Sequence, residues 1–581
     1  MRKTKIICTL GPATDDENVL RKLLLEGMDA ARFNFSHSDH ASHKAKLDIL
    51  VRIRDELKLH VATILDTKGP EIRIGKFKTG KIQLKKDNTF TLTTKDIEGD
   101  ENIVSISYKN LTKDIKAGSI VLIDDGLIEL SVISISDTDI VCRILNSGEI
   151  SNNKGVNVPG TNLSIPFISD KDRADIIFGI KNGFDFIAAS FTRTAADVLE
   201  IRKIFEDNGC RSVNIIAKIE NAEGVKNIDD ILAVSDGIMV ARGDMGVEIA
   251  LEDVPILQKI IIKKAYNAGK LVITATQMLD SMMKNPRPTR AEATDVANAI
   301  YDGTSAIMLS GETAAGLYPV ESLITMSKIT VRAEKDIDYR KRFNMRDIDI
   351  TSDVTNAISH ATCNTAHDLG AKAIITITKS GRTARMISKY RPLSPIIGCS
   401  TTKTVCRQLN LSWGIFPLLI VEDDNTDELF EHAIDASKKT GIVSNGDLVV
   451  ITAGVPIGIS GTTNLMKVYV VGHILASGTG ITSKSVCARL CVCKNEDEAI
   501  RKFSDGDIIV IPQTSNAILT LLKKAAGIIT EQSGVDSHAA TVGCALDIPV
   551  IVGAHDATII LKSGEVVILD ASRGIVCRNY N

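Results

Sequence analysis

The sequence predicts an α/β fold: an eight-stranded β/α barrel with an inserted β-domain, a doubly wound α/β domain and a C-terminal α/β domain. The chain has 581 residues, which is enough for several domains. Eight short apolar runs, each followed by a helix-like stretch, repeat across residues 1–340. A block of shorter, alternating runs interrupts this series between residues 70 and 167.

The eight apolar runs are rich in Ile, Val and Ala along their whole length. Such runs are typical of strands buried on both faces, as in parallel sheets. Eight strand–helix units within about 240 residues fit a β/α barrel. The runs begin at Lys5, Ala30, Val61, Phe186, Ile215, Gly237, Leu271 and Ala306.

Two patterns predict helices between these strands. In residues 38–57, Leu47, Leu50 and Val51 recur at the i, i+3, i+4 spacing of one helix face. Thr289 and Glu292 form a capping box, which satisfies two free amide donors at the start of a helix.

The insert predicts a small β-rich lid domain hinged on the barrel after its third strand. Short alternating runs are separated by turn residues at 124–126 and 146–148. Residues 75–82 are similar to a phosphate-binding P-loop. They lack the final hydroxyl and lie among strands, so we discard that interpretation.

Beyond the barrel, strand–helix alternation resumes with fewer strands, beginning at Lys372, Pro395 and Asp447, which predicts an open doubly wound domain. Residues 472–480 contain three Gly and are predicted to be a linker. The predicted domains are a barrel (1–69 and 168–344), a lid (70–167), an α/β domain (345–472) and a C-terminal domain (473–581).

Composition narrows the class of protein. Apolar residues make up 44 % and charged residues 24 %, which excludes disorder as the main state. The net charge of −3 disfavours a nucleic-acid partner, and no apolar run reaches the ~18 residues of a membrane span. The 11 scattered Cys favour a reducing, cytoplasmic location. We expect Cys487, Cys491 and Cys493 to be buried strand thiols, because Cys-x-Cys is a poor zinc spacing.

Polar residues follow six of the eight runs, and in a β/α barrel these strand ends meet at one rim. Any single one is explained as a satisfied strand-end residue, but so many charges at one rim require a ligand to offset their desolvation. Glu220 and Asp244 are hard oxygen donors suited to Mg²⁺. Arg32 and Lys218 supply cationic donors for a phosphoryl group. A second oxygen-rich cluster with one carboxylate suits a monovalent cation and comprises Asn34, Ser36, Asp66 and Thr67.

Several segments at these strand ends resemble those of the pyruvate kinase family. The segment Ile215-Ile-Ala-Lys-Ile-Glu-Asn-Ala-Glu-Gly is similar to the family's active-site segment. Further similar segments begin at Arg32, Leu65, Lys154, Ala241 and Ala275. The resemblance covers residues 1–472, and it implies the barrel, the β-lid and the α/β domain already inferred.

The resemblance implies conversion of phosphoenolpyruvate and ADP into pyruvate and ATP, with Mg²⁺ (or Mn²⁺) and K⁺ as cofactors, by a homotetramer. The residues it carries over are Arg32 and Lys218 for the phosphoryl group, Glu220 and Asp244 for the divalent metal, Gly243 and Asp244 for the substrate carboxylate, Thr276 for protonation of the enolate, Asn34, Ser36, Asp66 and Thr67 for K⁺, and Asn34, His37, Arg73 and Lys154 for the ADP phosphates.

Position 71 refines the cofactor prediction. In this family Glu at that position accompanies K⁺ dependence and Lys accompanies K⁺ independence, because a lysine ammonium can replace the ion electrostatically. The residue here is Glu71, so we expect K⁺ dependence.

A second anion site is predicted after the strand that begins at Lys372. Small residues, hydroxyls and backbone amides at a helix start bind phosphate, and the segment resembles the family's effector loop. It implies activation by a phosphorylated sugar or nucleotide, with residues 454–463 as a neighbouring wall. The alternative is an ordinary turn. The loop residues are Thr378, Lys379, Ser380, Gly381, Arg382 and Thr383.

The C-terminal domain, around Gly527–Val542, resembles the phosphohistidine swivel domain of phosphoenolpyruvate-utilising enzymes, with His538 at the phosphohistidine position. The segment departs from the family pattern at Ser533 and Asp536, and a carboxylate so close to His538 would repel a phosphohistidine. We therefore favour a structural or regulatory domain. Two other functions stay open: a dikinase-like phosphotransferase working through His538, and a non-catalytic sensor of phosphorylated metabolites.

Overall fold

The computed structural model describes all residues except 346–352, 424, 456–462, 473 and 579–581. The chain divides into two compact units. One comprises Met1–Ala357 and Thr378–Leu419, and the other comprises Ile358–Ile377 and Ile420–Asn581.

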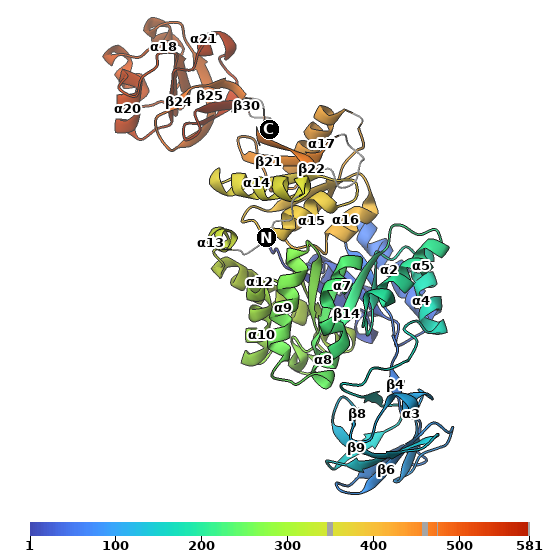
Figure 1. Ribbon diagram of the computed structural model, residues 1–581. Helices are drawn as coiled ribbons and strands as arrows, with labels where there is room; N and C mark the ends of the chain where they lie inside the picture. Colours follow the sequence, from blue (N-terminus) through green and yellow to red (C-terminus); the bar gives the residue numbers. More distant parts are fainter. Residues whose placement is uncertain (346–352, 424, 456–462, 473, 579–581) are drawn as a thin grey trace. The chain divides into compact units, whose positions relative to one another are not determined.

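The first unit contains a closed barrel of eight parallel strands, as the sequence predicts (Figure 1). Neighbours in the barrel follow chain order, with β1 closing against β17. The strands are β1 (Lys5–Thr9), β2 (Ala30–Asn34), β3 (Ala62–Asp66), β13 (Phe186–Ala189), β14 (Asn214–Ile219), β15 (Gly237–Ala241), β16 (Leu271–Ala275) and β17 (Ala306–Leu309).

Helices follow the barrel strands, and their starts and faces match the predicted patterns. Leu47 and Leu50 are buried against the barrel, and the Thr289–Glu292 capping box is present. The helices are α1 (Glu17–Leu25), α2 (His40–Glu56), α4 (Asp170–Lys181), α5 (Ala195–Asp207), α6 (Ala222–Lys226), α7 (Ile228–Val234), α8 (Arg242–Glu248), α9 (Val254–Asn267), α10 (Arg290–Asp302), α11 (Gly311–Ala314), α12 (Pro319–Asp336) and α13 (Tyr339–Asn344).

The insert between β3 and β13, called the lid below, is β-rich as predicted, with a seven-stranded sheet in the order β4-β12-β8-β9-β10-β6-β7 and a two-stranded sheet of β11 and β5. The discarded P-loop-like segment leads into a strand rather than a helix. The lid elements are β4 (Ile72–Arg73), β5 (Lys81–Leu84), β6 (Thr89–Thr93), β7 (Ile103–Ser105), α3 (Leu111–Asp114), β8 (Ile120–Ile123), β9 (Ile128–Ile135), β10 (Asp139–Ile144), β11 (Gly148–Ser151) and β12 (Gly155–Asn157).

The predicted α/β domain has elements in both units. In the first unit β19 (Ile396–Ser400) pairs in parallel with β20 (Ile415–Leu419). In the second unit β18 (Ala373–Ile377) pairs in parallel with β21 (Leu448–Gly454), and β22 (Thr463–Val470) pairs antiparallel with β21. The helices are α14 (Val354–Asp368), α15 (Arg382–Lys389), α16 (Lys403–Leu409) and α17 (Thr426–Lys439).

The second unit ends in an eight-stranded mixed sheet with order β23-β30-β29-β25-β26-β27-β28-β24. Its strands are β23 (Ile474–Ser477), β24 (Thr479–Gly480), β25 (Ser485–Val492), β26 (Ile508–Ile511), β27 (Gly527–Thr530), β28 (Val550–Val552), β29 (Val566–Asp570) and β30 (Ile575–Arg578). Its helices are α18 (Glu496–Lys502), α19 (Leu519–Leu522), α20 (His538–Leu546) and α21 (Ala557–Ile560).

The linker predicted at residues 472–480 is wrong for most of its length. Ile474–Ser477 pairs with β30, and Thr479–Gly480 pairs with β28. The glycines serve close packing here: a Cβ on Gly480 would lie 1.6 Å from the Ala571 carbonyl oxygen, and a Cβ on Gly478 would lie 2.5 Å from that of Val552.

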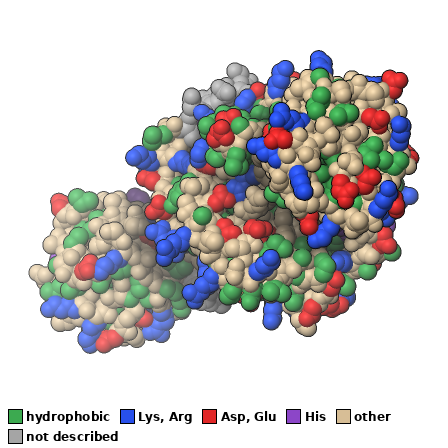
Figure 2. All heavy atoms as spheres, turned by 90° about the horizontal axis from the view of Figure 1, so that it is seen from below, with side chains coloured by type: hydrophobic (Ala, Val, Ile, Leu, Met, Phe, Trp, Pro, Cys, Tyr) green, Lys and Arg blue, Asp and Glu red, His purple; other side chains and the backbone are tan. Residues whose placement is uncertain are grey.

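Surface and thiol chemistry are ordinary for a globular protein. On the face shown in Figure 2, acidic and basic side chains are interspersed. Within the described residues no helix has the length and apolarity needed to cross a membrane. All 11 Cys lie in the described part of the chain, and none of them forms a disulfide. Cys491 and Cys493 are buried as predicted, whereas Cys487 is exposed, which corrects the prediction for that residue.

Candidate active site

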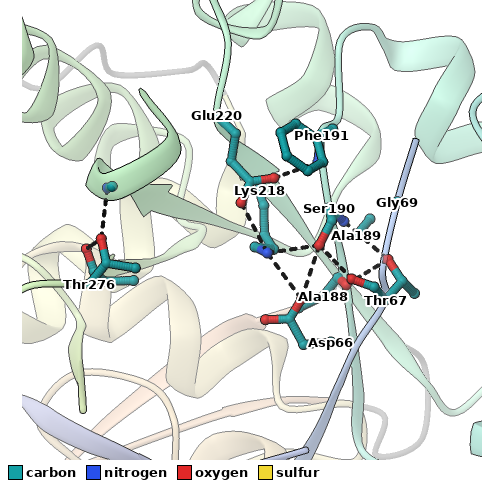
Figure 3. A network of polar contacts seen from close by, with 12 residues as sticks. Asp66, Thr67, Gly69, Ala188, Ala189, Ser190, Phe191, Lys218, Glu220 and Thr276 are labelled. Carbon is teal, nitrogen blue, oxygen red and sulfur yellow. Dashed lines mark hydrogen bonds and ion pairs between the residues drawn. The ribbon is translucent and has the colours of Figure 1, made fainter. Parts of the chain in front are cut away.

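The carboxyl ends of the barrel strands bring some of the predicted rim residues together in one polar network, namely Asp66, Thr67, Lys218 and Glu220, whereas Thr276 lies apart from it (Figure 3). Lys218 is in β14, and its Nζ lies 3.0 Å from Asp66 Oδ1, 2.7 Å from Ser190 Oγ and 3.0 Å from Glu220 Oε1. Lys218 and Glu220 are two residues apart, so the strand alternation directs both side chains to the same side. Burial alone would lower the pKa of Lys218, but Asp66 and Glu220 outweigh it and raise the pKa above its ordinary value. Lys218 is therefore a fixed positive charge.

Asp66, at the end of β3, links two cations. Its Oδ2 accepts a hydrogen bond from Arg32 Nε at 2.6 Å, and its Oδ1 accepts from Lys218 at 3.0 Å. The side chain is only 1 % exposed. Burial opposes ionisation of Asp66, but Arg32 and Lys218 outweigh it and hold its pKa below the ordinary value. The sequence predicts Asp66 in a separate monovalent-cation cluster; the structure shows that it belongs to the lysine network as well.

Glu220 follows β14 and has no exposed side-chain surface. Its Oε2 accepts from the backbone N–H of Phe191 at 2.5 Å. Its Oε1 is buried without a hydrogen-bond partner, although Lys218 Nζ is 3.0 Å away. Burial raises the pKa of Glu220 to about 7; Lys218 opposes this rise and Asp244 adds to it. A buried carboxylate oxygen with unused acceptor capacity fits a divalent cation.

The other predicted metal ligand, Asp244, lies in the first turn of α8, which begins directly after β15. The preceding residue, Gly243, donates its backbone N–H to Thr276 Oγ1 at 2.8 Å. Thr276 has φ +67°, a left-handed conformation that is uncommon outside glycine. The structure thus fixes the end of β16 to the start of α8, on the side of the rim away from Asp66 in Figure 3.

The predicted monovalent-cation residues lie at the ends of β2 and β3. Asn34 Oδ1 accepts from the Ser36 backbone N–H at 3.1 Å, and the Thr67 carbonyl oxygen accepts from Ser190 Oγ at 2.6 Å. These residues offer an amide oxygen, a hydroxyl, a carbonyl and one carboxylate, all of them hard oxygen donors. The carboxylate of this set, Asp66, already neutralises two cations.

A cavity of about 680 Å³ lies between the lid and the barrel rim. Arg73, Lys154 and Asp244 line it, whereas Asn34 and His37 are not among its lining residues. Arg73 Nε donates to Glu71 Oε2 at 2.9 Å, and Lys154 Nζ lies 2.9 Å from Asp124 Oδ1. Two of the four predicted nucleotide residues therefore face the cavity, and both are paired with lid carboxylates.

Two other charged residues at strand ends, Arg242 and Glu312, have hydrogen-bond partners within the protein. Arg242 Nη1 donates to Asp295 at 2.6 Å, and its Nη2 donates to the Thr276 carbonyl at 2.7 Å. Glu312 accepts from the backbone N–H groups of Leu279 at 3.0 Å and Ser310 at 2.8 Å.

Sequence reasoning missed Ser190 and Phe191, which follow β13. Ser190 bridges Lys218, Asp66 and Thr67. Phe191 has φ +55°, and its backbone N–H is aimed at Glu220. The only available sign of these roles was a polar residue at the end of an apolar run.

The predicted effector loop lies between β18 and α15. The Thr378 backbone N–H donates to the Cys399 carbonyl at 3.0 Å, and Arg385 Nη2 donates to the Ser380 carbonyl at 3.2 Å. Gly381, at φ +79°, precedes the helix. Most of the predicted wall at 454–463 lies outside the described residues.

In the C-terminal domain His538 begins α20, behind the capping residue Ser537. Its Nδ1 lies 2.9 Å from Thr514 Oγ1, and its Nε2 lies 3.1 Å from Asn516 Oδ1. Both ring nitrogens thus have hydrogen-bond partners within the domain.

A closed barrel of eight parallel strands whose rim carries a buried lysine between carboxylates, beside a polar cavity, defines a β/α-barrel protein with a charged site at its strand ends. Family models identify it further. Residues 1–323 match the pyruvate kinase barrel domain, residues 356–469 the pyruvate kinase alpha/beta domain, and residues 503–574 the mobile domain of PEP-utilising enzymes. The chain belongs to the pyruvate kinase family.

Individual relatives agree with the family models. A pyruvate kinase of Bacillus licheniformis is 50 % identical over 578 residues, covering 99 % of each chain. One of Sporosarcina psychrophila is 48 % identical and covers 100 % of this chain and 99 % of its own. A crystal structure of a pyruvate kinase from Cryptosporidium parvum matches with a TM-score of 0.77 and 42 % identity, over 81 % of this chain and 96 % of that one.

Proposed function

We propose that this protein transfers the phosphoryl group of phosphoenolpyruvate to ADP, giving pyruvate and ATP as the last step of glycolysis. The observation that carries the proposal is the Lys218–Asp66–Glu220 network at the barrel rim, beside a cavity that also has Arg73 and Lys154 on its lid side. Full-length similarity to curated pyruvate kinases supports it and disfavours the dikinase alternative.

In this reaction the phosphorus–oxygen bond to the enol oxygen breaks, and a β-phosphate oxygen of ADP takes the phosphoryl group. Arg32 and Lys218 bind the moving group and neutralise its charge, and Lys218 also stabilises the enolate oxygen left behind. Asp66 holds both cations in place through its 2.6 Å and 3.0 Å contacts. The enolate then gains a proton on carbon, through a water held near Thr276, to give pyruvate.

Glu220 and Asp244 would hold Mg²⁺ or Mn²⁺, which supplies Lewis-acid charge neutralisation for the substrate oxygens. The backbone amides of Gly243 and Asp244 would orient the substrate carboxylate. Asn34, Ser36, Asp66 and Thr67 would bind K⁺, and Glu71 supports K⁺ dependence because a carboxylate cannot replace that ion.

The lid would bind ADP and exclude water. Arg73 and Lys154, with Asn34 and His37, would bind the ADP phosphates. Asn157 Nδ2 on the lid donates to Glu248 Oε1 at the end of α8, at 2.8 Å. This contact connects the lid to the helix that carries Asp244. The position of the lid would therefore be coupled to substrate binding. A closed lid would also keep out water that would hydrolyse phosphoenolpyruvate.

Regulation and assembly form the finer part of the proposal. Residues 378–383 would bind a phosphorylated sugar or nucleotide as an activator, and the enzyme would work as a cytoplasmic homotetramer, as the family resemblance implies. His538 would be structural or regulatory, because both of its ring nitrogens have partners and Asp536 is close in sequence.

The experiment is pyruvate formation from phosphoenolpyruvate and ADP with Mg²⁺ and K⁺. Wild-type protein should form pyruvate, and Glu220→Gln should lower kcat at least 100-fold, a typical loss for electrostatic groups at a reacting centre. The matched control is Glu56→Gln, on an exposed glutamate that pairs with Arg21, and it should match wild type. Equal activity of Glu220→Gln and wild type would refute the site.

A further inference from the structure

Ser190 is a buried serine at the centre of the rim network. It lies one residue beyond β13 and is 2 % exposed. Its Oγ is 2.7 Å from Lys218 Nζ, 2.6 Å from the Thr67 carbonyl oxygen and 3.0 Å from Asp66 Oδ1 (Figure 3).

The hydrogen-bond donors and acceptors around the Ser190 hydroxyl determine its role in the network. A hydroxyl has one proton and two acceptor lone pairs. Because an ammonium only donates, Ser190 Oγ must accept from Lys218, and its own proton goes to Thr67 or Asp66. Two of the three N–H bonds of Lys218 are therefore directed at fixed acceptors, Ser190 and Asp66. The third N–H is left for Glu220 or a substrate oxygen.

We propose that Ser190 is a positioning residue for phosphoryl transfer, acting through Lys218. It sets the direction of the ammonium and connects it to the main chain of Thr67. An ammonium on a four-carbon stem is flexible. Asp66 directs one N–H bond of the ammonium, and the Ser190 hydroxyl directs a second. Without Ser190 the ammonium would be free to rotate about its remaining bond to Asp66. This inference rests on the proposed function.

Space around Ser190 is limited on one side by Gly69. A Cβ added to Gly69 would lie 2.8 Å from Ser190 Cβ, so the chain after β3 packs closely on the serine. Ser190→Ala removes only the hydroxyl and introduces no new atom into this contact. It is therefore the primary test, and Ser190→Cys is the second variant, nearly equal in size but a weak acceptor.

Ser190→Ala should lower kcat for pyruvate formation by about 10- to 100-fold while the KM for phosphoenolpyruvate changes less than about threefold, because the lost interaction orients a group needed in the transition state. Ser190→Cys should behave similarly. The matched control is Ser322→Ala. That hydroxyl is also buried, it donates to the carbonyl of Tyr318, the N-cap residue of its own helix, and its loss should leave kcat unchanged.

A double-mutant cycle distinguishes an effect that acts through Lys218 from a structural disturbance of the whole site. In a Lys218→Met background, measured under single-turnover conditions with enzyme in excess, Ser190→Ala should change the rate by less than about twofold, because its effect passes through the missing ammonium. A loss in this background equal to that in wild type would overturn the proposal, as would wild-type kcat in Ser190→Ala. If wild-type protein itself formed no pyruvate, the proposed function would fail instead.

Discussion

Asp66→Asn is the most informative perturbation of the buried charge network. The variant keeps the side-chain shape but removes a carboxylate that contacts both Arg32 and Lys218, at 2.6 Å and 3.0 Å. An asparagine amide would also place N–H donors against these cationic donors. Removing one partner of a buried ion pair costs about 3–5 kcal/mol, because the remaining charge is left uncompensated.

The assay is thermal unfolding in K⁺-free buffer, followed by the fluorescence of Trp413. This residue is the single Trp of the chain and lies in the barrel-containing unit. The expected loss lowers the midpoint by roughly 6–10 °C, at about 2 °C per kcal/mol for a large domain. The matched control is Asp229→Asn, which breaks an exposed pair with Lys264 and should cost at most about 1 kcal/mol.

The pH dependence of the same difference provides a second check. The pKa of Asp66 is lowered in the folded protein, so its stabilisation is fully present above the unfolded pKa of about 3.9. This stabilisation is lost as the pH falls through the pKa of Asp66 in the folded protein. The difference in unfolding midpoint between wild type and Asp66→Asn should therefore disappear in acid. A midpoint for Asp66→Asn within 2 °C of that for Asp229→Asn at about neutral pH would refute this reasoning.

Four further predictions follow from the structure and the proposed function. Burial lowers the pKa of Lys3 to about 8, and the Lys3 Nζ lies 5.2 Å from the centre of the Trp413 ring. The fluorescence of Trp413 should therefore change with pH near pH 8 in wild type, and this change should be absent in Lys3→Met. Because unfolded chains keep this proton up to about pH 10.4, Lys3 should make stability rise with pH above 8. Glu71→Lys should permit pyruvate formation without K⁺, whereas wild type in a Na⁺- and K⁺-free buffer should be nearly inactive. Ser380→Asp should abolish activation by phosphorylated metabolites through like-charge repulsion, while unchanged activation would exclude the loop. His538→Ala should retain ADP-dependent activity, and its loss would revive the phosphohistidine alternative.

The barrel could be predicted because its strands are buried on both faces and leave near-continuous apolar runs. Strands without that signal were missed. β20 contains Pro417, which lacks an N–H and disfavours a strand assignment, and β22 has Lys467 within an alternating, partly exposed run. The prediction of a linker at residues 472–480 was wrong for a related reason. Glycine is common in flexible linkers, but it also allows the close approach of two backbones, as at Gly480.

The candidate site was predictable to the extent that strand ends converge in a barrel. Lys218 and Glu220 could be placed together from their spacing on one strand. The sharing of Asp66 between two predicted clusters could not be found, because it depends on side-chain directions across β2, β3 and β14. Ser190 was hidden for the same reason: its partners Asp66 and Lys218 are 124 and 28 residues away in sequence and become neighbours only through strand pairing.

The central claim is that the rim network performs phosphoryl transfer, and its most direct test is single-turnover transfer to ADP by Lys218→Met. Phosphoenolpyruvate labelled on phosphorus would be mixed with excess enzyme, Mg²⁺, K⁺ and ADP, and labelled ATP would be followed in time. Wild type should form labelled ATP, and Lys218→Met should do so at least 1,000-fold more slowly, as expected when a group that neutralises the transferring phosphoryl is lost. Transfer at the wild-type rate by Lys218→Met would contradict the account.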